Sequence, residues 1–308
     1  MKTLIVMAML APFCSVFADE KAAAPAEKTA GEKLAEQESE KEEESDDAGF
    51  WVEAGVDILS DYMWRGIILD DNVVWQPTAS LGYNTEEFGG LYVNWWASFD
   101  LTDRRNRMPW GNNSRQCGSI HEIDYYVGYT KSFGDFDFEV GHYWYDYPYN
   151  GKHGNHCAGH LNSDLYFSTA YNNDYITPGV EVFWDYGREH GHDPSGCYIR
   201  FSAKHKFELT EQLSLTPKAT LGLGNHQFTK ANIAGYRENS RDNYGPELTD
   251  QTSTLTLAYA ITENLTISGS INYTWVPSHA LRHERWLTAG HDSRNQLIWG
   301  GVNVTLSF

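Results

Sequence analysis

Apolar and polar residues alternate over several stretches of this chain. Near the C-terminus the apolar residues and glycine hold every second position: Ile298, Gly300, Val302, Val304, Leu306 and Phe308. Polar residues such as Asn303 and Thr305 stand between them. A period of two residues is typical of a β-strand with one apolar face and one polar face. The pattern therefore predicts an all-β protein.

Twelve such strands are predicted from residue 50 onward. They cover residues 50–66, 74–84, 90–101, 119–132, 136–147, 163–172, 175–187, 197–209, 212–224, 250–261, 264–276 and 294–308. Most reach the roughly 9–11 residues that a tilted strand needs to cross a membrane. Their connections alternate between short turns and longer loops, which is typical of an antiparallel up-and-down outer-membrane β-barrel. Both termini are then expected on the periplasmic side.

The first 48 residues do not share this pattern. Lys2, the apolar stretch from Leu4 to Phe17 and the small residue Ala18 predict a signal peptide over residues 1–18. Residues 19–48 hold 12 acidic residues against four lysines, with Leu34 as the only large aliphatic one. Such a low-complexity segment cannot bury enough apolar area to order itself, so a disordered periplasmic segment is expected, with a tether for a basic partner or cations as the alternative. The barrel is assigned to residues 49–308.

Composition narrows the possible functions. The formal net charge of -19 argues against a nucleic-acid partner, because a surface that binds phosphates must be basic. A soluble β-sandwich or lipocalin-like barrel is the competing fold, but the polar strand faces carry too many charges to fill a dry core. The inward face must therefore be wet. A membrane barrel has lipid and lipopolysaccharide as its surroundings, in the outer membrane of a Gram-negative-type bacterium.

The period-two rule assigns charged residues to the lumen. The acidic ones are Glu53, Asp57, Asp61, Asp100, Glu122, Asp124, Asp137, Glu139, Glu181 and Asp185. The basic ones are Arg65, Arg200, Lys204, Lys206 and Lys218. The two groups are expected to form acidic and basic walls that face each other across the lumen. Because the acids outnumber the bases, a pore lined by them would favour cations or zwitterions among small polar solutes.

The alternative is a blocked, structural or surface-interaction barrel. Twelve strands lie between the roughly eight whose lumen side chains can fill and the roughly sixteen that leave an open channel. Five inward aromatic residues would narrow the lumen further: Tyr92, Trp96, Tyr126, Tyr143 and Tyr145. Arg65 is a candidate constriction residue, or else a structural partner of Asp57 and Asp61 on the same face.

Histidine and cysteine gather in two predicted outer loops. A site for Zn²⁺ or copper, and a role in metal-ion uptake, is therefore an alternative, with His153, His156, Cys157, His160, His190 and His192 as candidate ligands. A disulfide among Cys117, Cys157 and Cys197 competes with it. No other cofactor is indicated. No enzyme is predicted either, because no serine stands with a histidine in a recognisable catalytic pattern; Ser278 and His279 lie in a loop.

Several short motifs resemble those of the TorF-type porin family. They are Ser60 to Ile67, Gln76-Pro77, Trp95 to Ser98, Tyr145 to Pro148 and Pro178 to Asp185. The resemblance spans most of the barrel and implies an outer-membrane barrel that passes solutes. The acidic tract and the His/Cys-rich loops depart from that family's pattern. The C-terminal Phe308 also resembles the signal that the barrel-assembly machinery reads in outer-membrane proteins, which makes that machinery an expected partner.

Overall fold

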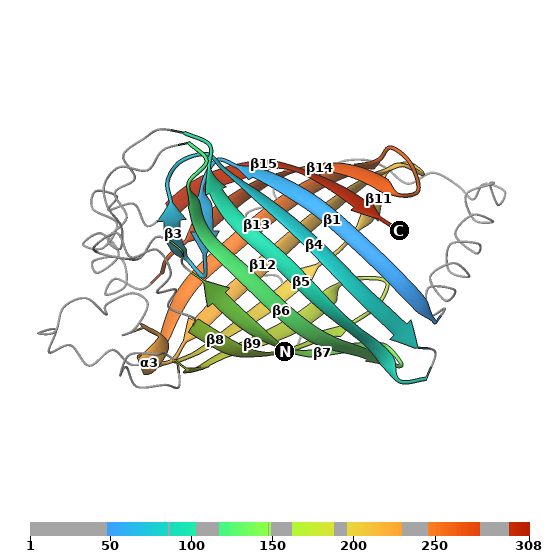
Figure 1. The fold of residues 1–308 in the computed structure, drawn as a ribbon, viewed down its shortest axis with the longest axis horizontal. Helices are drawn as coiled ribbons and strands as arrows, with labels where there is room; N and C mark the ends of the chain where they lie inside the picture. The colour runs from blue at the N-terminus through green and yellow to red at the C-terminus, as the bar shows by residue number, and fades with distance from the viewer. Residues whose placement is uncertain are drawn as a thin grey trace, which may run out of the picture.

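Antiparallel strands close into one barrel in the computed structural model, which describes residues 48–85, 87–102, 117–146, 148, 162–187, 196–229, 246–277 and 296–308 (Figure 1). The spanning strands are β1 Gly49–Leu59, β4 Val74–Thr85, β5 Gly89–Asp100, β6 Ile120–Phe133, β7 Phe136–Asp146, β8 Asn162–Tyr171, β9 Thr177–Gly187, β10 Gly196–Lys204, β12 Leu213–Gly224, β13 Glu247–Ala260, β14 Leu265–Trp275 and β15 Gln296–Ser307. Each pairs with its neighbours in chain order, and β1 pairs with β15 to close the ring. The predicted twelve-stranded up-and-down barrel is confirmed.

The outer surface of this barrel is apolar. Along β1, the exposed positions Phe50, Val52 and Ile58 alternate with inward residues such as Asp57. The same alternation places exposed hydrophobic residues on every spanning strand. A closed ring leaves no unpaired strand edge, so the backbone polar groups of the strands are satisfied within the sheet. An apolar exterior on a closed barrel is the architecture that a bilayer requires.

The two ends of the barrel differ. Short connections follow β4, β6, β8, β10 and β13, and the C-terminal residue Phe308 lies at the same end, at the right of Figure 1. We call this the turn end. At the opposite end, which we call the loop end, lie the C-terminal ends of β5, β7, β9, β12 and β14 and the short helix α3, His226–Thr229. In the described segments, no helix is long and apolar enough to cross a membrane.

The first predicted strand is too long at its C-terminal end. It was expected over residues 50–66, but β1 stops at Leu59, and two short strands, β2 Tyr62–Trp64 and β3 Ile67–Asp70, form a separate hairpin. Trp64 pairs with Ile67 across a two-residue turn. The turn residues Arg65 and Gly66 have φ angles of 47° and 79°, and positive φ at both positions is typical of a tight hairpin turn.

The eighth predicted strand is also too long. β10 ends at Lys204, and Phe207–Glu208 forms the short strand β11 beside β12. Lys206, predicted to face the lumen, instead lies exposed in the connection at the turn end, 2.5 Å from a carboxylate oxygen of Glu208. Because β10 ends at Lys204, the alternation of that strand no longer sets the direction of Lys206. The other ten predicted strands agree with the observed ones to within three residues at each end.

Candidate functional site

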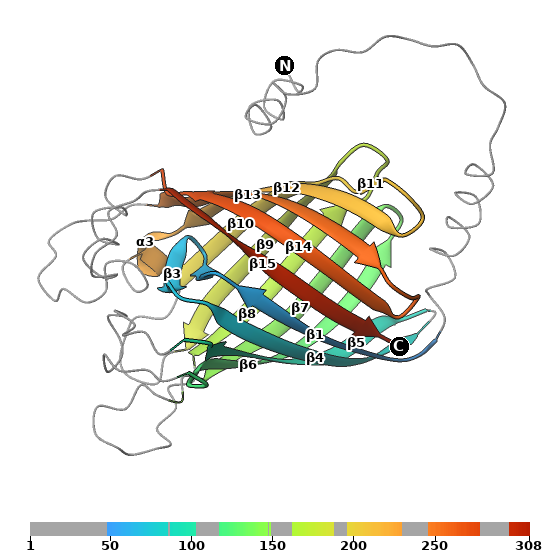
Figure 2. The ribbon, with the colours of Figure 1, turned by 90° about the horizontal axis from the view of Figure 1, so that it is seen from above.

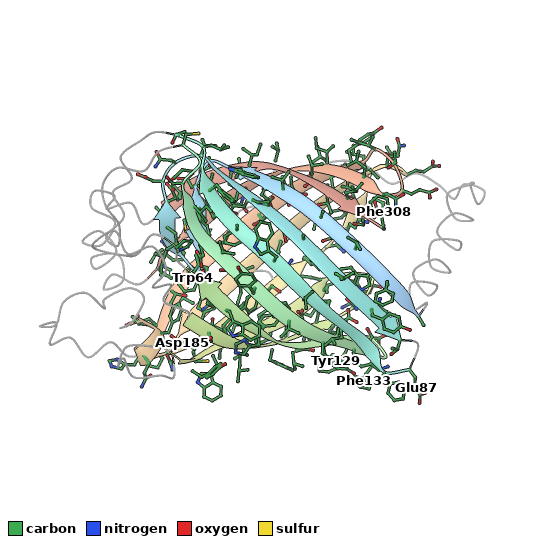
Figure 3. All side chains as sticks on the ribbon, in the orientation of Figure 1. Trp64, Glu87, Tyr129, Phe133, Asp185 and Phe308 are labelled. Atoms are coloured by element: carbon green, nitrogen blue, oxygen red, sulfur yellow. The ribbon has the colours of Figure 1, made fainter. Side chains whose placement is uncertain are left out.

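The β2–β3 hairpin folds into the loop end of the barrel. Both β3 and α3 lie at the loop end (Figure 2), and the ring of Trp64, labelled in Figure 3, lies 6.0 Å from that of Phe228 on α3. The hairpin pairs with no wall strand, so only its ends and its side chains hold it in place. The segments that join the hairpin to β1 and β4 are short, because Leu59 and Val74 are already paired with each other in the barrel wall.

Arg65, at the hairpin tip, is the centre of the contacts. Its Nη2 lies 2.8 Å from Oδ2 of Asp164 on β8 and donates a second hydrogen bond of 3.3 Å to the hydroxyl of Tyr145 on β7. The side chains of Arg65 and Asp164 are only 6% and 5% exposed. A guanidinium buried this deeply needs a charged partner, since an unpaired buried charge is strongly destabilising.

Aromatic rings surround the same guanidinium group. Its central carbon lies 4.1 Å from the ring centre of Phe183, 4.4 Å from Trp64 and 5.2 Å from Tyr198. Phe228 of α3 adds a fourth ring at 5.9 Å. Each ring presents a negative face to the cation, which stabilises the charge where water is excluded. The hairpin tip is therefore fixed by strands β7, β8, β9 and β10 together.

Two further contacts reach other parts of the wall. The hydroxyl of Tyr62 donates a 2.9 Å hydrogen bond to Glu122 on β6. Gly66 packs against β13, where an added Cβ would lie 2.7 Å from the Cβ of Asp250. Asp250 is held by the hydroxyl of Tyr198, 3.0 Å from its Oδ1. Contacts to β6, β8 and β13 mean that the hairpin extends across the lumen.

The structure corrects the predicted environment of Arg65. The prediction placed Arg65 beside Asp57 and Asp61 on the first strand. Asp61 instead lies in the bend before β2, where Ser60 donates a 2.7 Å hydrogen bond to it, and Asp57 remains on β1 opposite Asn303. The ion pair of Arg65 is with Asp164, because the hairpin carries the guanidinium away from β1 and across the barrel.

The remaining predicted lumen residues share the inward face. They are Glu53, Asp57, Asp100, Glu122, Asp124, Asp137, Glu139, Glu181, Asp185, Arg200, Lys204 and Lys218. Cross-strand partners lie on one side of a sheet, and the exposed hydrophobic residues occupy the other side. The inward face is therefore polar and charged on most strands.

Burial of this face changes along the barrel axis. At the loop end, around the hairpin, Asp100 and Glu122 are each 2% exposed. Nearer the turn end, Glu53, Asp137 and Lys204 are exposed although they share the inward face. Since these three charged side chains lie on the inward face near the turn-end limits of their strands, their exposure means that the turn-end mouth of the lumen is open to solvent. The hairpin is the part that fills the loop-end half.

The acidic and basic walls do not oppose each other as predicted. The acids of β5 to β9 run directly into the bases of β10 and β12, and Arg200 binds Glu181 of the adjacent strand through two hydrogen bonds, one of 2.7 Å. Opposite β6 and β7, six positions around the ring, stand β13 and β14. Their inward residues are mostly neutral and include Thr252, Thr254, Asn272 and Thr274. The order of the strands around the ring decides which walls lie opposite each other. The alternation within a single strand does not contain that information.

A tyrosine cluster lies on the acidic side of the lumen. The hydroxyls of Tyr92 and Tyr126 each donate a 2.5 Å hydrogen bond to Oε1 of Glu139. Tyr143 and Tyr145 stack with their ring centres 5.7 Å apart. The hydroxyl of Tyr145 donates a 3.0 Å hydrogen bond to Asp164, so Tyr92, Tyr126 and Tyr145 are all held against the wall by carboxylates.

Three residues of the site were missed by the sequence analysis. Asp164 occupies an inward position of β8, so alternation could have found it. Asp250 lies on β13 opposite Gly222, again on the inward face. Phe228 belongs to α3, which follows β12 within a long connection, and no periodic signal marks it.

The predicted metal ligands cannot be placed in this site. His153, His156, Cys157, His160, His190 and His192 lie outside the described residues. Within the described ranges, no three His, Cys, Asp or Glu side chains are grouped so that they could hold a metal ion. Cys117 and Cys197 are not joined to each other, and Cys157 is outside the described part, as are Ser278 and His279.

The fold and the charged, partly wet lumen define a membrane-spanning β-barrel with an in-folded hairpin. The chain belongs to the family described as "Bacterial protein of unknown function (Gcw_chp)", whose model matches residues 43–250. That match does not confirm the TorF name. No curated protein matches the chain.

Solved structures with some likeness are outer-membrane barrels. A KdgM porin shares 10% identity, covering 84% of this chain and 99% of its own, with a TM-score of 0.42. The COG4313 outer membrane channel from Pseudomonas putida F1 shares 6% identity, covering 85% and 96%, at 0.46. Outer membrane phospholipase A from Escherichia coli shares 12%, covering 82% and 89%, at 0.40. Likenesses this weak say nothing about what this chain carries or catalyses.

Proposed function

We propose that this protein is an outer-membrane channel through which small polar solutes diffuse, with cations and zwitterions favoured. The solvent exposure of inward charged residues carries the proposal. Glu53, Asp137 and Lys204 are exposed on the inward face at the turn-end mouth, as expected for a water-filled entrance and not for a packed core. A lumen lined with charges also has the means to select among solutes.

The hairpin is the constriction of this channel. It lies across the loop end and presents Arg65 to Asp164 on the far wall. A loop held inside a barrel by side-chain contacts limits the size of solutes without closing the rest of the lumen. Its fixed position, tied to residues of six wall strands, keeps the remaining opening constant.

The preference for cations follows from the charges near that constriction. The loop-end lumen carries acidic residues on several strands: Asp57, Asp100, Glu122, Asp124, Asp185 and Asp250. Two described arginines lie at this level, Arg65 and Arg200, whose central guanidinium carbons are 4.1 Å and 5.7 Å from the Phe183 ring centre. Their charges are already paired, with Asp164 and Glu181 respectively. An excess of negative charge in a low-dielectric wall concentrates cations at the entrance.

A barrel closed by its hairpin is the second candidate, because Arg65 and its partners are buried and leave little open area around the tip. In that case the protein has a structural or surface-interaction role. Metal uptake through the His/Cys-rich loops remains a prediction, since those residues lie outside the described part. The signal peptide and the interaction of Phe308 with the assembly machinery are likewise proposals. Phe308 lies exposed at the turn end, with its backbone paired to Val52 (Figure 3).

The test is the single-channel current of the refolded protein in a planar bilayer under a KCl gradient. Discrete steps with a reversal potential on the cation-selective side support the channel. Steps with an anion-selective reversal potential would overturn the preference, while a folded barrel without steps would favour the closed, structural barrel.

A further inference from the structure

Two lysines on adjacent strands lie side by side on the inward face of the barrel. Lys204 on β10 and Lys218 on β12 are directly paired in the register, so both side chains lie on the inward face at the same level. Like charges directly opposite each other in an antiparallel pair are destabilising. A sheet that keeps this pair places two ammonium groups where an anionic group can bridge them.

Glu181, the acid that interacts with Lys218, is shared with Arg200, so it cannot neutralise both lysines. Arg200, four residues from Lys204 along β10, donates two hydrogen bonds to Glu181 and takes up most of its charge. The ion pairs among described residues join Arg65 to Asp164, Arg200 to Glu181 and Lys206 to Glu208, and include neither Lys204 nor Lys218. The inward neighbour of Lys218 on β13 is Thr254, which has a hydroxyl and no charge.

This pair lies nearer the turn end of the barrel than the hairpin does. Along β10, Lys204 is six residues from Tyr198, which contacts Arg65; at about 3.3 Å per residue that is roughly 20 Å along the strand. A solute entering at the loop end therefore meets the acidic surroundings of the hairpin first and the two lysines second. The acidic residues around the hairpin repel a simple anion. A zwitterion is attracted by these acidic residues through its positive group and by the two lysines through its negative group.

We infer that Lys204 and Lys218 form a subsite for the carboxylate of small zwitterionic solutes, which the acidic loop-end lumen admits through their ammonium groups. This inference rests on the proposed channel function. The two lysines make zwitterions the preferred solutes over simple cations, because only a zwitterion is stabilised both by the acidic loop-end residues and by the lysine pair. Carboxylate bridging by two ammonium groups is a charge-assisted contact and needs no further ligand.

Liposome swelling with the full-length protein tests this inference. The probes are L-alanine, which is zwitterionic, and lactamide, which is similar in size and uncharged. We expect the ratio of the L-alanine rate to the lactamide rate to fall about threefold or more in Lys204→Gln/Lys218→Gln, because two charge contacts are lost. The lactamide rate should change much less. Lys204→Arg/Lys218→Arg, which keeps both charges, should retain most of the ratio.

Lys206→Gln is the matched control, since it removes the same charge from the exposed connection next to β10. It should leave the ratio unchanged. If the double glutamine variant keeps the wild-type ratio while lactamide still permeates, the carboxylate subsite is wrong and the channel stands. If neither solute enters through the folded wild-type barrel, the channel itself is wrong. Heat-modifiable migration on gels checks that each variant is folded.

Discussion

Arg65 and Asp164 lie 99 positions apart in the chain and form a buried ion pair of 2.8 Å inside the barrel. One residue comes from the tip of an in-folded hairpin and the other from the far wall. Because the hairpin has no backbone pairing with the wall, this contact and its aromatic surroundings are what hold the constriction in place. The first prediction follows from it.

Asp164→Asn should destabilise the barrel and release the hairpin tip. It leaves a buried guanidinium without its charged partner, which costs about 3–5 kcal/mol in comparable buried pairs. Urea unfolding of the detergent-folded protein measures the loss of stability, and single-channel conductance should rise. Asp137→Asn is the control, because Asp137 is an exposed inward residue far from the hairpin. Equal effects of the two variants would contradict the role given to the ion pair.

Gly66→Ala should lower the unfolding free energy by more than the positive φ angle of Gly66 alone explains. Gly66 has φ 79° and faces Asp250, so an added methyl group meets both the left-handed backbone and the wall. Gly134→Ala is a matched control with φ 57° and nothing within 4 Å. The left-handed backbone should cost about 1–2 kcal/mol in each. Overpacking adds about 1–3 kcal/mol at Gly66 only. Indistinguishable unfolding free energies would show that Gly66 does not touch the wall.

Asp57→Asn should reduce cation selectivity without altering the hairpin. Asp57 is an inward residue of β1 and makes no contact with Arg65, so the barrel should stay folded. Removing one lumen carboxylate moves the reversal potential in a KCl gradient toward zero, and the shift should shrink at high salt because charges are screened. A reversal potential unchanged at every salt concentration would mean that this carboxylate does not sense the permeating ions.

Strand positions were predictable because alternation is a local property. In a strand with one face toward lipid and one toward water, the apolar and polar positions themselves show which side faces outward. Glu181 and Lys218 could therefore be assigned to the inward face without knowledge of the neighbouring strands. The closure of β1 on β15 also followed, since an even number of strands with alternating connection lengths leaves no other simple arrangement.

The hairpin was not predictable by the same reasoning. Alternation continues through Asp61 and Arg65, so the pattern extended the first strand past its true end at Leu59. The turn has arginine in a left-handed conformation, where asparagine or aspartate before glycine is the usual signal. Its partner Asp164 lies on a strand that is distant in sequence, and only the three-dimensional closure of the barrel brings the two together.

The most direct measurement compares the wild-type barrel with one in which residues 61–72 are replaced by a short Gly-Ser turn between β1 and β4. Both are refolded and recorded in planar bilayers under the same KCl gradient. We expect discrete steps from both proteins, a several-fold larger conductance for the shortened barrel and cation selectivity in each. Equal conductances would contradict the hairpin as the constriction, and silence from two folded barrels would contradict the channel itself.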